Sequence, residues 1–208
     1  MPPAGSVATG GPTASGGEVT VRLRRPHPGQ RRVLREARRF NVVVCGRRWG
    51  KTTLAENRAA LTAVVARQPA GWFAPTYKQL SEAWRTLVDD LEPVTKRRSE
   101  QEHRLETVTG GVIECWSLDE PNAARGRAYA RGVIDEAAYV RDLERAWTQV
   151  IRPTLTDYQG DAWFPSTPNG LNYFHTLYRR GLDPAQAEWA SWQLPTTDNP
   201  YLVAAEVE

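Results

Sequence analysis

A buried-strand pattern that runs directly into a glycine-containing turn, and then into a helix pattern, most constrains how this chain folds. Residues 40–45 (FNVVVC) form a mostly β-branched run, which is typical of a strand buried on both faces of a parallel sheet. Residues 51–66 (KTTLAENRAALTAVVA) place apolar side chains at helical spacing. Gly46 and Gly50 lie in the turn between them. Strand, turn and helix in this order predict an α/β fold.

The alternation of strands and helices continues along the chain. A short helix beginning at Pro28 precedes the first strand, and residues 103–117 alternate around Gly110 and Gly111, which predicts an antiparallel hairpin. The other predicted strands span residues 71–76, 132–135 and 162–165, and the other predicted helices span 77–91, 143–151 and 171–180. We therefore expect a three-layer α/β sandwich with a mainly parallel central sheet.

Length and composition predict one folded domain preceded by a tail. The 208 residues suit about one globular domain. Residues 1–18 contain little to bury and are rich in turn and linker residues, so we expect a flexible tail there and a folded domain over residues 19–208. No run approaches the roughly 18 apolar residues of a membrane-spanning helix, and the N-terminus has no apolar signal segment. We expect no membrane partner.

Cysteine and histidine usage predicts neither a disulfide framework nor a metal site. Cys45 and Cys115 are too few for either, so a reducing cytoplasm is the expected compartment. His27, His103 and His175 are widely separated, without cysteine or carboxylate at ligand spacing.

The net charge of +3 is unevenly distributed. Residues 22–48 contain ten arginines and one glutamate, so the rest of the chain is net acidic. Only three basic residues are lysines. This bias fits either genome composition or recognition of phosphate groups, so the charge alone assigns no partner.

The turn after the first strand has the chemistry of a phosphate cradle. Glycine permits a tight turn in which successive N–H groups and the helix N-terminus face an anion. Lys51 is expected to reach the β- and γ-phosphates and Thr52 to bind Mg²⁺. The full G-x-x-x-x-G-K-[ST] pattern requires glycine where this chain has Cys45, so a tight turn capped by Thr52 is the alternative. The candidate nucleotide-binding residues are Gly46, Arg47, Arg48, Trp49, Gly50, Lys51, Thr52 and Thr53.

Two adjacent acids follow an apolar strand in the segment GVIDE. The carboxyl ends of parallel strands form the ligand crevice of an α/β sheet, so the acids and the phosphate turn are expected at one edge. Asp135 is then a candidate Mg²⁺ ligand, and Glu136 a candidate base that orients and deprotonates water. The alternative is an acid pair that only stabilises a helix N-terminus.

Phosphoryl transfer also needs positive charge and a sensor of the γ-phosphate. Arg47 and Arg48 lie in the turn itself, and Arg125 and Arg127 lie in a loop before the acid pair. Such an arginine contributes about 10³ to 10⁵ in rate, although a surface salt bridge is the alternative for each of them.

The segment PSTP ends the next predicted strand. The hydroxyls of Ser166 and Thr167 are candidates for sensing the γ-phosphate at that point. A turn bounded by prolines is the alternative.

Together these residues resemble the ATPase domain of a tailed-bacteriophage terminase large subunit, the motor that packages DNA. The motifs that carry the resemblance are HPGQ, CGRRWGKT, APTYKQ, the R-G before VIDEA, STP and DNPY, which extend from Pro26 to Tyr201. The resemblance implies a RecA-like (ASCE) P-loop NTPase fold with ATP and Mg²⁺. It also implies three partners: double-stranded DNA, further copies of the chain in a homo-oligomeric ring on the portal, and the small terminase subunit. The implied location is the procapsid in the host cytoplasm.

The resemblance also implies roles for individual residues. Gln30 reads the adenine, Arg47 acts within its own subunit, and Arg125 is the finger offered to a neighbouring subunit, with Arg127 as the alternative. Thr167 couples hydrolysis to movement. A nuclease domain follows the ATPase domain in this family and is expected to be absent here, so no DNA cleavage is expected.

Two other functions fit the same motifs. A helicase-like, DNA-dependent ATPase has a similar core, but it normally carries a second motor domain. A nucleotide switch that does not hydrolyse ATP would not need a base beside its Mg²⁺ ligand, so Glu136 discriminates between a switch and an enzyme.

Overall fold

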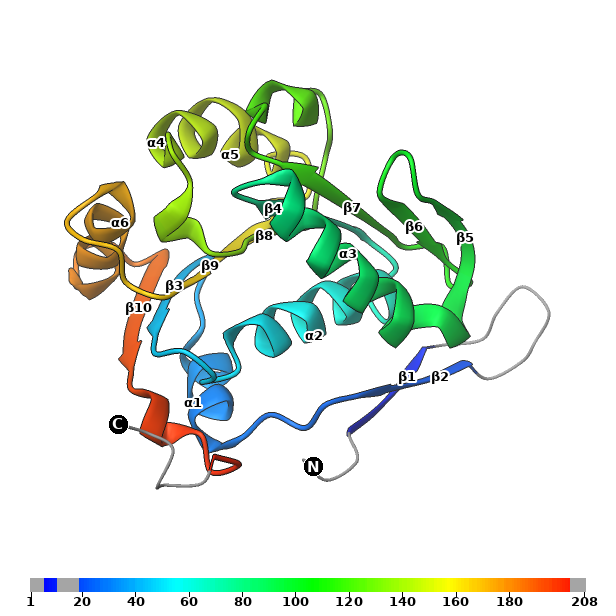
Figure 1. The fold of residues 1–208 in the computed structure, drawn as a ribbon, viewed down its shortest axis with the longest axis horizontal. Helices are drawn as coiled ribbons and strands as arrows, with labels where there is room; N and C mark the ends of the chain where they lie inside the picture. The colour runs from blue at the N-terminus through cyan, green and yellow to red at the C-terminus, as the bar shows by residue number, and fades with distance from the viewer. Residues whose placement is uncertain (1–5, 11–18, 203–208) are drawn as a thin grey trace.

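A computed structural model describes residues 6–10 and 19–202, with an eight-stranded sheet at its centre (Figure 1). The strand order is β10–β3–β9–β8–β4–β7–β6–β5. The strands from β10 to β7 are parallel, and β6 and β5 extend the sheet antiparallel. The bounds are Phe40–Cys45 for β3, Pro69–Ala74 for β4, Thr95–Ser99 for β5, Arg104–Thr107 for β6, Val112–Ser117 for β7, Arg131–Ile134 for β8, Asp161–Ser166 for β9 and Trp189–Leu194 for β10.

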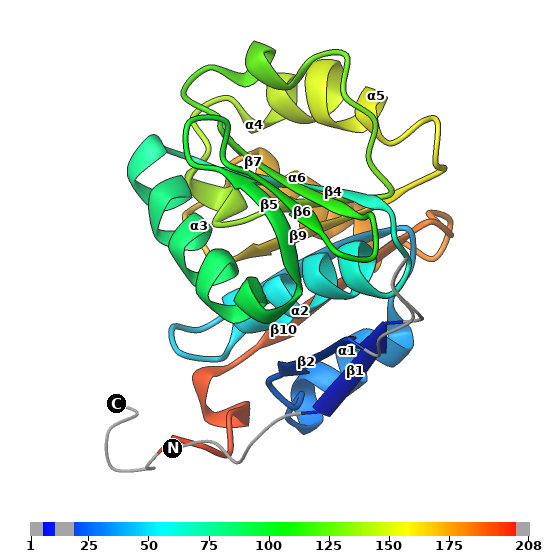
Figure 2. The ribbon, with the colours of Figure 1, turned by 90° about the vertical axis from the view of Figure 1, so that its right-hand side faces the viewer.

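Helices cover both faces of this sheet, which confirms the three-layer α/β sandwich (Figure 2). On one face lie α2 and α3, and on the other lie α6 and the segment from α4 to α5. A π-helical segment, Ala146–Ile151, joins α4 to α5. The bounds are Pro28–Glu36 for α1, Lys51–Val64 for α2, Tyr77–Leu91 for α3, Leu143–Arg145 for α4, Arg152–Thr154 for α5 and Tyr173–Leu182 for α6.

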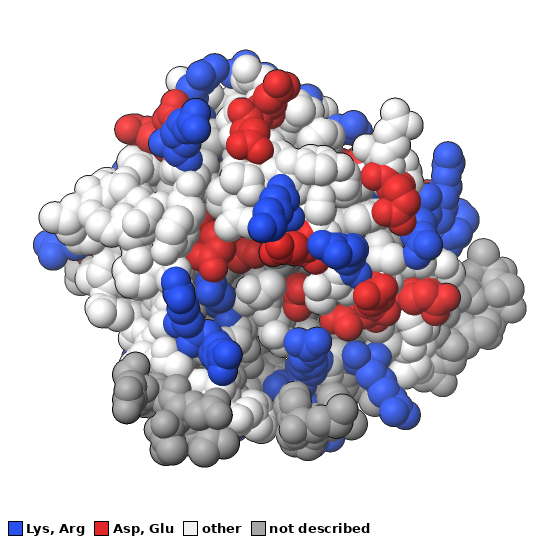
Figure 3. Space-filling view, viewed as in Figure 1, with Lys and Arg blue, Asp and Glu red and all other residues white. Residues whose placement is uncertain are grey.

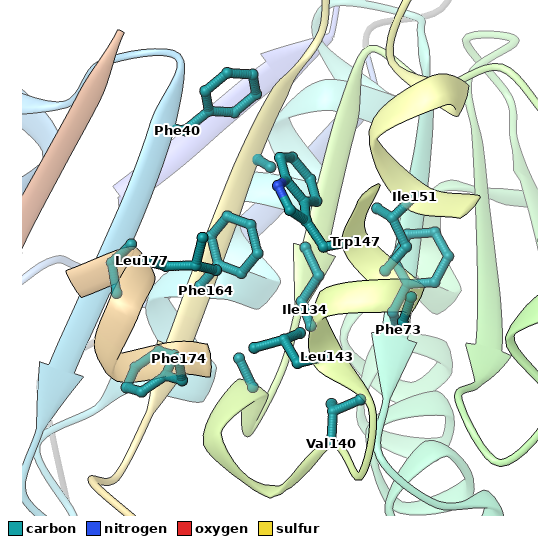
Figure 4. Packing of buried hydrophobic residues seen from close by; sticks show 14 of the residues in the cluster. Phe40, Phe73, Ile134, Val140, Leu143, Trp147, Ile151, Phe164, Phe174 and Leu177 are labelled. Atoms are coloured by element: carbon teal, nitrogen blue, oxygen red, sulfur yellow. The ribbon is translucent and has the colours of Figure 1, made fainter. Parts of the chain in front are cut away.

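Strand β3 is buried along its whole length because it lies between β10 and β9 and has helices on both sides. Phe40 and Val42 face the α4–α6 side, and Val43 faces α1 and α2. The α4–α6 side is an aromatic core in which the Trp147 ring meets Phe40 and Phe164 edge to face (Figure 4). This packing fixes the strand from which the phosphate turn emerges.

The predicted elements are mostly confirmed. The first strand and the helix over 77–91 match β3 and α3 at both ends, whereas β4 begins and ends two residues before the predicted strand. The predicted hairpin is β6–β7. Strands β5 and β10 were not expected. No described helix is long and apolar enough to cross a membrane.

The structure describes one strand within the tail expected over residues 1–18. Strand β1, Ser6–Gly10, pairs antiparallel with β2, Val19–Leu23, while residues 1–5 and 11–18 lie outside the described residues. Val21 and Leu23 of β2 are buried against the α2–α3 side of the core. The composition of residues 1–18 does not reveal this pairing, because the apolar partner strand begins only at Val19.

Candidate functional site

The turn from β3 to α2 has the backbone shape of an anion cradle. Gly50 is the N-cap of α2 at φ 98°, and Arg48 is also left-handed at φ 59°. No side chain of the described residues caps this helix, and its first turn contains no acidic residue. The helix N-terminus therefore presents free N–H groups and its positive dipole end to an anion.

Lys51, the first residue of α2, points to the end of β8. Its Nζ lies 3.0 Å from Oε1 of Glu136, and the two side chains are only 11% and 24% exposed. Glu136 is itself left-handed at φ 46°, directly after Asp135. The structure thus brings the predicted phosphate-binding lysine and the predicted base into one ion pair.

The other carboxylate oxygen of Glu136 faces the end of β9. Its Oε2 lies 3.3 Å from Oγ of Ser166, 3.3 Å from the backbone nitrogen of Thr167 and 3.4 Å from Thr167 Oγ1. These contacts exist because β9 lies between β3 and β8 in the sheet. The predicted hydroxyl element therefore contacts the predicted base directly.

Asp135 is held in a low-dielectric position beside this pair. Burial, and then the negative charge of Glu136, raise the pKa of Asp135 to about 7, while Lys51 opposes the increase. Its Oδ1 accepts a hydrogen bond of 3.0 Å from the Glu136 backbone. A bound cation would restore the ionised form.

The donor set at this point fits magnesium. The described residues contain no group of three or more His, Cys, Asp or Glu that would enclose a metal. Mg²⁺ usually keeps several waters and takes one or two carboxylates plus phosphate oxygens. Asp135, with the hydroxyl of Thr52, would supply the protein share of such a shell.

A C-terminal segment braces the turn, and sequence reasoning missed it. Thr196 Oγ1 donates to the Arg47 carbonyl at 3.0 Å, and Asn199 Nδ2 donates to the Arg48 carbonyl at 2.7 Å. A side chain at Gly46 would collide with Thr196, so the two segments fit only with glycine there. The DNPY motif was the available signal, since it contains Asn199.

Gln30 holds the turn from the other side. Its amide donates to the Gly50 carbonyl at 2.8 Å, and its Oε1 accepts the His27 backbone N–H at 2.9 Å. Burial lowers the pKa of His27, so the ring is neutral at pH 7 and donates through Nε2 to the Trp49 carbonyl at 2.8 Å. Gln30, which the resemblance assigns to recognition of adenine, therefore already forms a hydrogen bond with the turn.

A cavity of about 220 Å³ opens beside the turn. Gln30, Gly50 and Thr53 form part of its wall, together with Arg24 and Tyr201. Arg24 also donates to Thr53 Oγ1 at 3.4 Å. Because Gln30 lines this cavity, it is a candidate position for the adenine base of a nucleotide.

Trp49 does not present its ring to this site. The indole is fully buried against Val33 of α1, Val43 of β3 and Leu54 of α2. A contact of Trp49 with a nucleotide at the turn would therefore come from its backbone.

The two loop arginines differ in how they are held. Nη1 of Arg127 lies 3.3 Å from Oε1 of the buried Glu114, and its guanidinium lies over the Trp116 ring at 5.2 Å. Arg125 is exposed, and its Nε donates to Asn122 within the same loop at 2.9 Å. Among the described residues, neither arginine forms an ion pair or hydrogen bond with Lys51, Asp135 or Glu136.

Acidic and basic side chains are interspersed on the face viewed in Figure 3, so this face is not uniformly basic. The arginine surplus of residues 22–48 therefore does not locate a nucleic-acid surface there.

The fold is that of a P-loop NTPase. The predicted phosphate turn joins β3 to α2, the acid pair follows β8, and β9 lies between these two strands.

A family model described as terminase large subunit, T4likevirus-type, N-terminal, matches residues 42–202. The chain belongs to this family of terminase large subunits, which confirms the resemblance stated above. The chain is 27% identical over 211 residues to the terminase large subunit of Escherichia phage T5, and 28% identical over 180 residues to that of Thermus virus P23-45. These matches cover 100% and 76% of this chain but 46% and 36% of the relatives, so the chain spans less than half their length.

Solved structures show the same fold. The ATPase domain of the Thermus phage P74-26 large terminase superposes with a TM-score of 0.70 at 25% identity, covering 82% of this chain and 81% of that domain. The large terminase of another thermophilic bacteriophage, in complex with ADP, superposes with a TM-score of 0.65 at 17% identity, covering 86% of this chain and 48% of that one.

Proposed function

We propose that this chain hydrolyses ATP and, as a motor domain in a ring on the portal, drives double-stranded DNA into a viral procapsid. The observation that carries the enzymatic part is the 3.0 Å contact between Lys51 and Glu136. It lies beside Asp135 and the open N-terminus of α2, so a phosphate group bound at the turn lies next to a carboxylate base.

The ion pair suits a resting site that ATP activates. The triphosphate binds to the turn and to the α2 N-terminus, and Lys51 turns from Glu136 to the phosphate oxygens. Glu136 is then free to accept a proton from water. Within the same subunit, Arg47 and Arg48 add positive charge at the turn.

Thr52 and Asp135 would hold magnesium at this position. Such an ion would supply positive charge to neutralise the negative charge that develops on the transferred phosphoryl group. The proposal of a bound nucleotide is supported by the large terminase of a thermophilic bacteriophage, which has the same fold and was solved in complex with ADP. The adenine base of the nucleotide would lie in the cavity beside Gln30.

The contacts of Glu136 with Ser166 and Thr167 suit a sensor of hydrolysis. A change at the carboxylate alters hydrogen bonds to both residues at the end of β9. Thr167 Oγ1 also donates to the hydroxyl of the exposed Tyr139 at 3.3 Å, which extends the chain of contacts outwards. We assign the coupling of hydrolysis to movement to this element.

Arg125 is the residue we assign as the finger that reaches a neighbouring subunit's ATP. It is exposed, and within the described part of the chain its side chain bonds only to Asn122 of its own loop, whereas Arg127 contacts Glu114 and Trp116. Arg127 then keeps the loop in place. The small terminase subunit is a further proposed partner, and the host cytoplasm is the proposed location. We expect no nuclease activity from this segment.

The test is a subunit-mixing experiment. Arg125→Ala and Lys51→Ala proteins are each expected to be inactive, and mixing them restores some ATPase activity because one contributes an intact turn and the other an intact finger. Arg179→Ala, which removes an exposed arginine of α6, is the control and keeps the wild-type rate. No recovery at any mixing ratio, at concentrations where the wild type is active, would contradict the finger assignment.

A further inference from the structure

Arginines gather around a second cavity, at the edge of the sheet opposite the phosphate turn. Its volume is about 620 Å³, and its wall includes Arg38, Arg39, Arg58, Arg131 and Asp161. Arg131 begins β8 and Asp161 begins β9, whereas Glu136 and Ser166 lie at the other ends of these parallel strands. This cavity is therefore separate from the nucleotide site.

Asp161, the acid in this wall, is already occupied by Arg131. The Arg131 Nε donates to Oδ1 at 2.7 Å, and the second guanidinium nitrogen bonds to Oδ2. Asp161 Oδ1 also accepts the indole N–H of Trp163 at 3.1 Å. The carboxylate has little acceptor capacity left for another arginine.

Among the described residues, the guanidinium of Arg58 of α2 has no hydrogen-bond acceptor. Its nearest approach to Asp161 is 3.9 Å, beyond hydrogen-bond distance, and its Nε is buried without a partner. The guanidinium lies 5.2 Å from the centroid of the Trp163 ring, and its side chain is 25% exposed. Burial, and then the neighbouring Arg131, lower its pKa to about 10, so it stays charged at pH 7.

The rim of the cavity adds charge without adding a partner for Arg58. Arg38 donates to the Ala187 carbonyl, and Arg39 donates to the Gly160 carbonyl and to Glu188. The four arginines around the cavity are accompanied by two carboxylates, those of Asp161 and Glu188. Positive charge is therefore in excess beside the cavity. A buried charged donor without an acceptor is unfavourable unless a ligand provides one.

We propose that this cavity binds a phosphate group, with Arg58 as its main ligand and Arg38 and Arg39 at its rim. Phosphate presents several acceptor oxygens in the geometry that a guanidinium binds in pairs, and its charge matches the excess of arginine. The phosphate comes either from solution or from a nucleic-acid backbone. This assignment does not depend on the proposed ATPase function.

The first test measures thermal stability in a Lys51→Ala background, in which the phosphate turn is impaired. Sodium phosphate is compared with sodium chloride at equal ionic strength. Phosphate at ten times its dissociation constant is expected to raise the Tm by about 3 °C. The rise is lost when Arg58→Gln is added, and it persists with Arg85→Gln, which replaces an exposed arginine of α3. A rise that survives Arg58→Gln overturns the proposal.

The chloride arm of the same experiment separates a binding role from a structural one. The Arg58 side chain forms no hydrogen bond within the described residues, so Arg58→Gln is expected to leave the Tm in chloride unchanged or higher. An equal loss of Tm in both salts would show that Arg58 stabilises the fold through Trp163 and Asp161, and would also overturn the proposal.

The second test separates the two sources of phosphate. Binding of a fluorescent 20-base-pair DNA duplex is measured over a range of salt concentrations. If the backbone is the ligand, Arg58→Gln weakens binding by about tenfold and reduces the salt slope by about one. If free phosphate is the ligand, duplex binding is unchanged while the phosphate-dependent rise in Tm is lost.

Discussion

Glu56 of α2 is an ionisable side chain whose burial makes the stability of the fold depend on pH. It is 6% exposed, and its carboxylate forms no hydrogen bond or ion pair within the described residues. Burial, and then the charge of Asp90, raise its pKa to about 7, while Arg24 opposes the increase and Asp135 adds to it. We expect Glu56→Gln to stabilise the protein at neutral and alkaline pH.

The size of the effect follows from the pKa. Below pH 4.5 the side chain is protonated in both the folded and the unfolded chain, so its contribution is absent. Between pH 4.5 and 7 the unfolded chain releases its proton first, and the free energy of unfolding falls as the pH rises. Above pH 7 the full penalty applies, and a displacement from 4.5 to about 7 corresponds to about 3 kcal/mol.

Urea unfolding at constant ionic strength tests this prediction. The free energy of unfolding of Glu56→Gln is expected to equal that of the wild type near pH 4.5 and to exceed it by about 3 kcal/mol at pH 8, with an unchanged m-value. Glu82→Gln, which makes the same change at an exposed position of α3, is the control and shows no such trend. A difference between Glu56→Gln and wild type that is the same at both pH values refutes the reasoning.

Two further predictions concern the turn and the aromatic core. Asn199→Ala removes the hydrogen bond to the Arg48 carbonyl, and we expect nucleotide affinity to fall about two- to tenfold, measured by calorimetry, with little change in Tm; unchanged affinity would show that the brace is not needed. Trp147→Ala leaves a cavity between Phe40 and Phe164, and we expect a loss of about 3 to 5 kcal/mol in urea unfolding, whereas a loss below about 1 kcal/mol would contradict the packing described.

The elements of the site that are local in the chain could be predicted from the sequence. The end of β3, the start of α2 and the acid pair after β8 each follow from a short pattern of side chains. The location of the turn and the acid pair at one edge of the sheet follows because the carboxyl ends of parallel strands lie at the same edge. The contact between Glu136 and Thr167 does not follow, because it depends on β9 lying between β3 and β8, and strand order is a property of the whole sheet.

The hydrogen bonds through which Gln30 and Asn199 support the site do not follow from local patterns, for a related reason. Gln30 and Asn199 hold the turn through hydrogen bonds to backbone carbonyls 20 and 151 residues away in the chain. An amide side chain can form hydrogen bonds with many different groups, so the residue type alone does not reveal which carbonyl Gln30 or Asn199 contacts. The position of the Trp49 ring does not follow from the turn alone either, because a tryptophan within a glycine turn can face either the ligand or the core, and here it packs with Val33 and Leu54.

The central claim, that Glu136 is the base of an ATP-hydrolysing site, is tested most directly by the turnover rate of Glu136→Gln at saturating ATP. Binding of ATP to Glu136→Gln is measured in the same preparation, so that loss of binding is distinguished from loss of chemistry. We expect ATP to bind as tightly as in the wild type or more tightly, because glutamine no longer forms an ion pair with Lys51. Turnover is expected to fall by at least about 100-fold. A wild-type rate would contradict the assignment of Glu136 and the mechanism built on it.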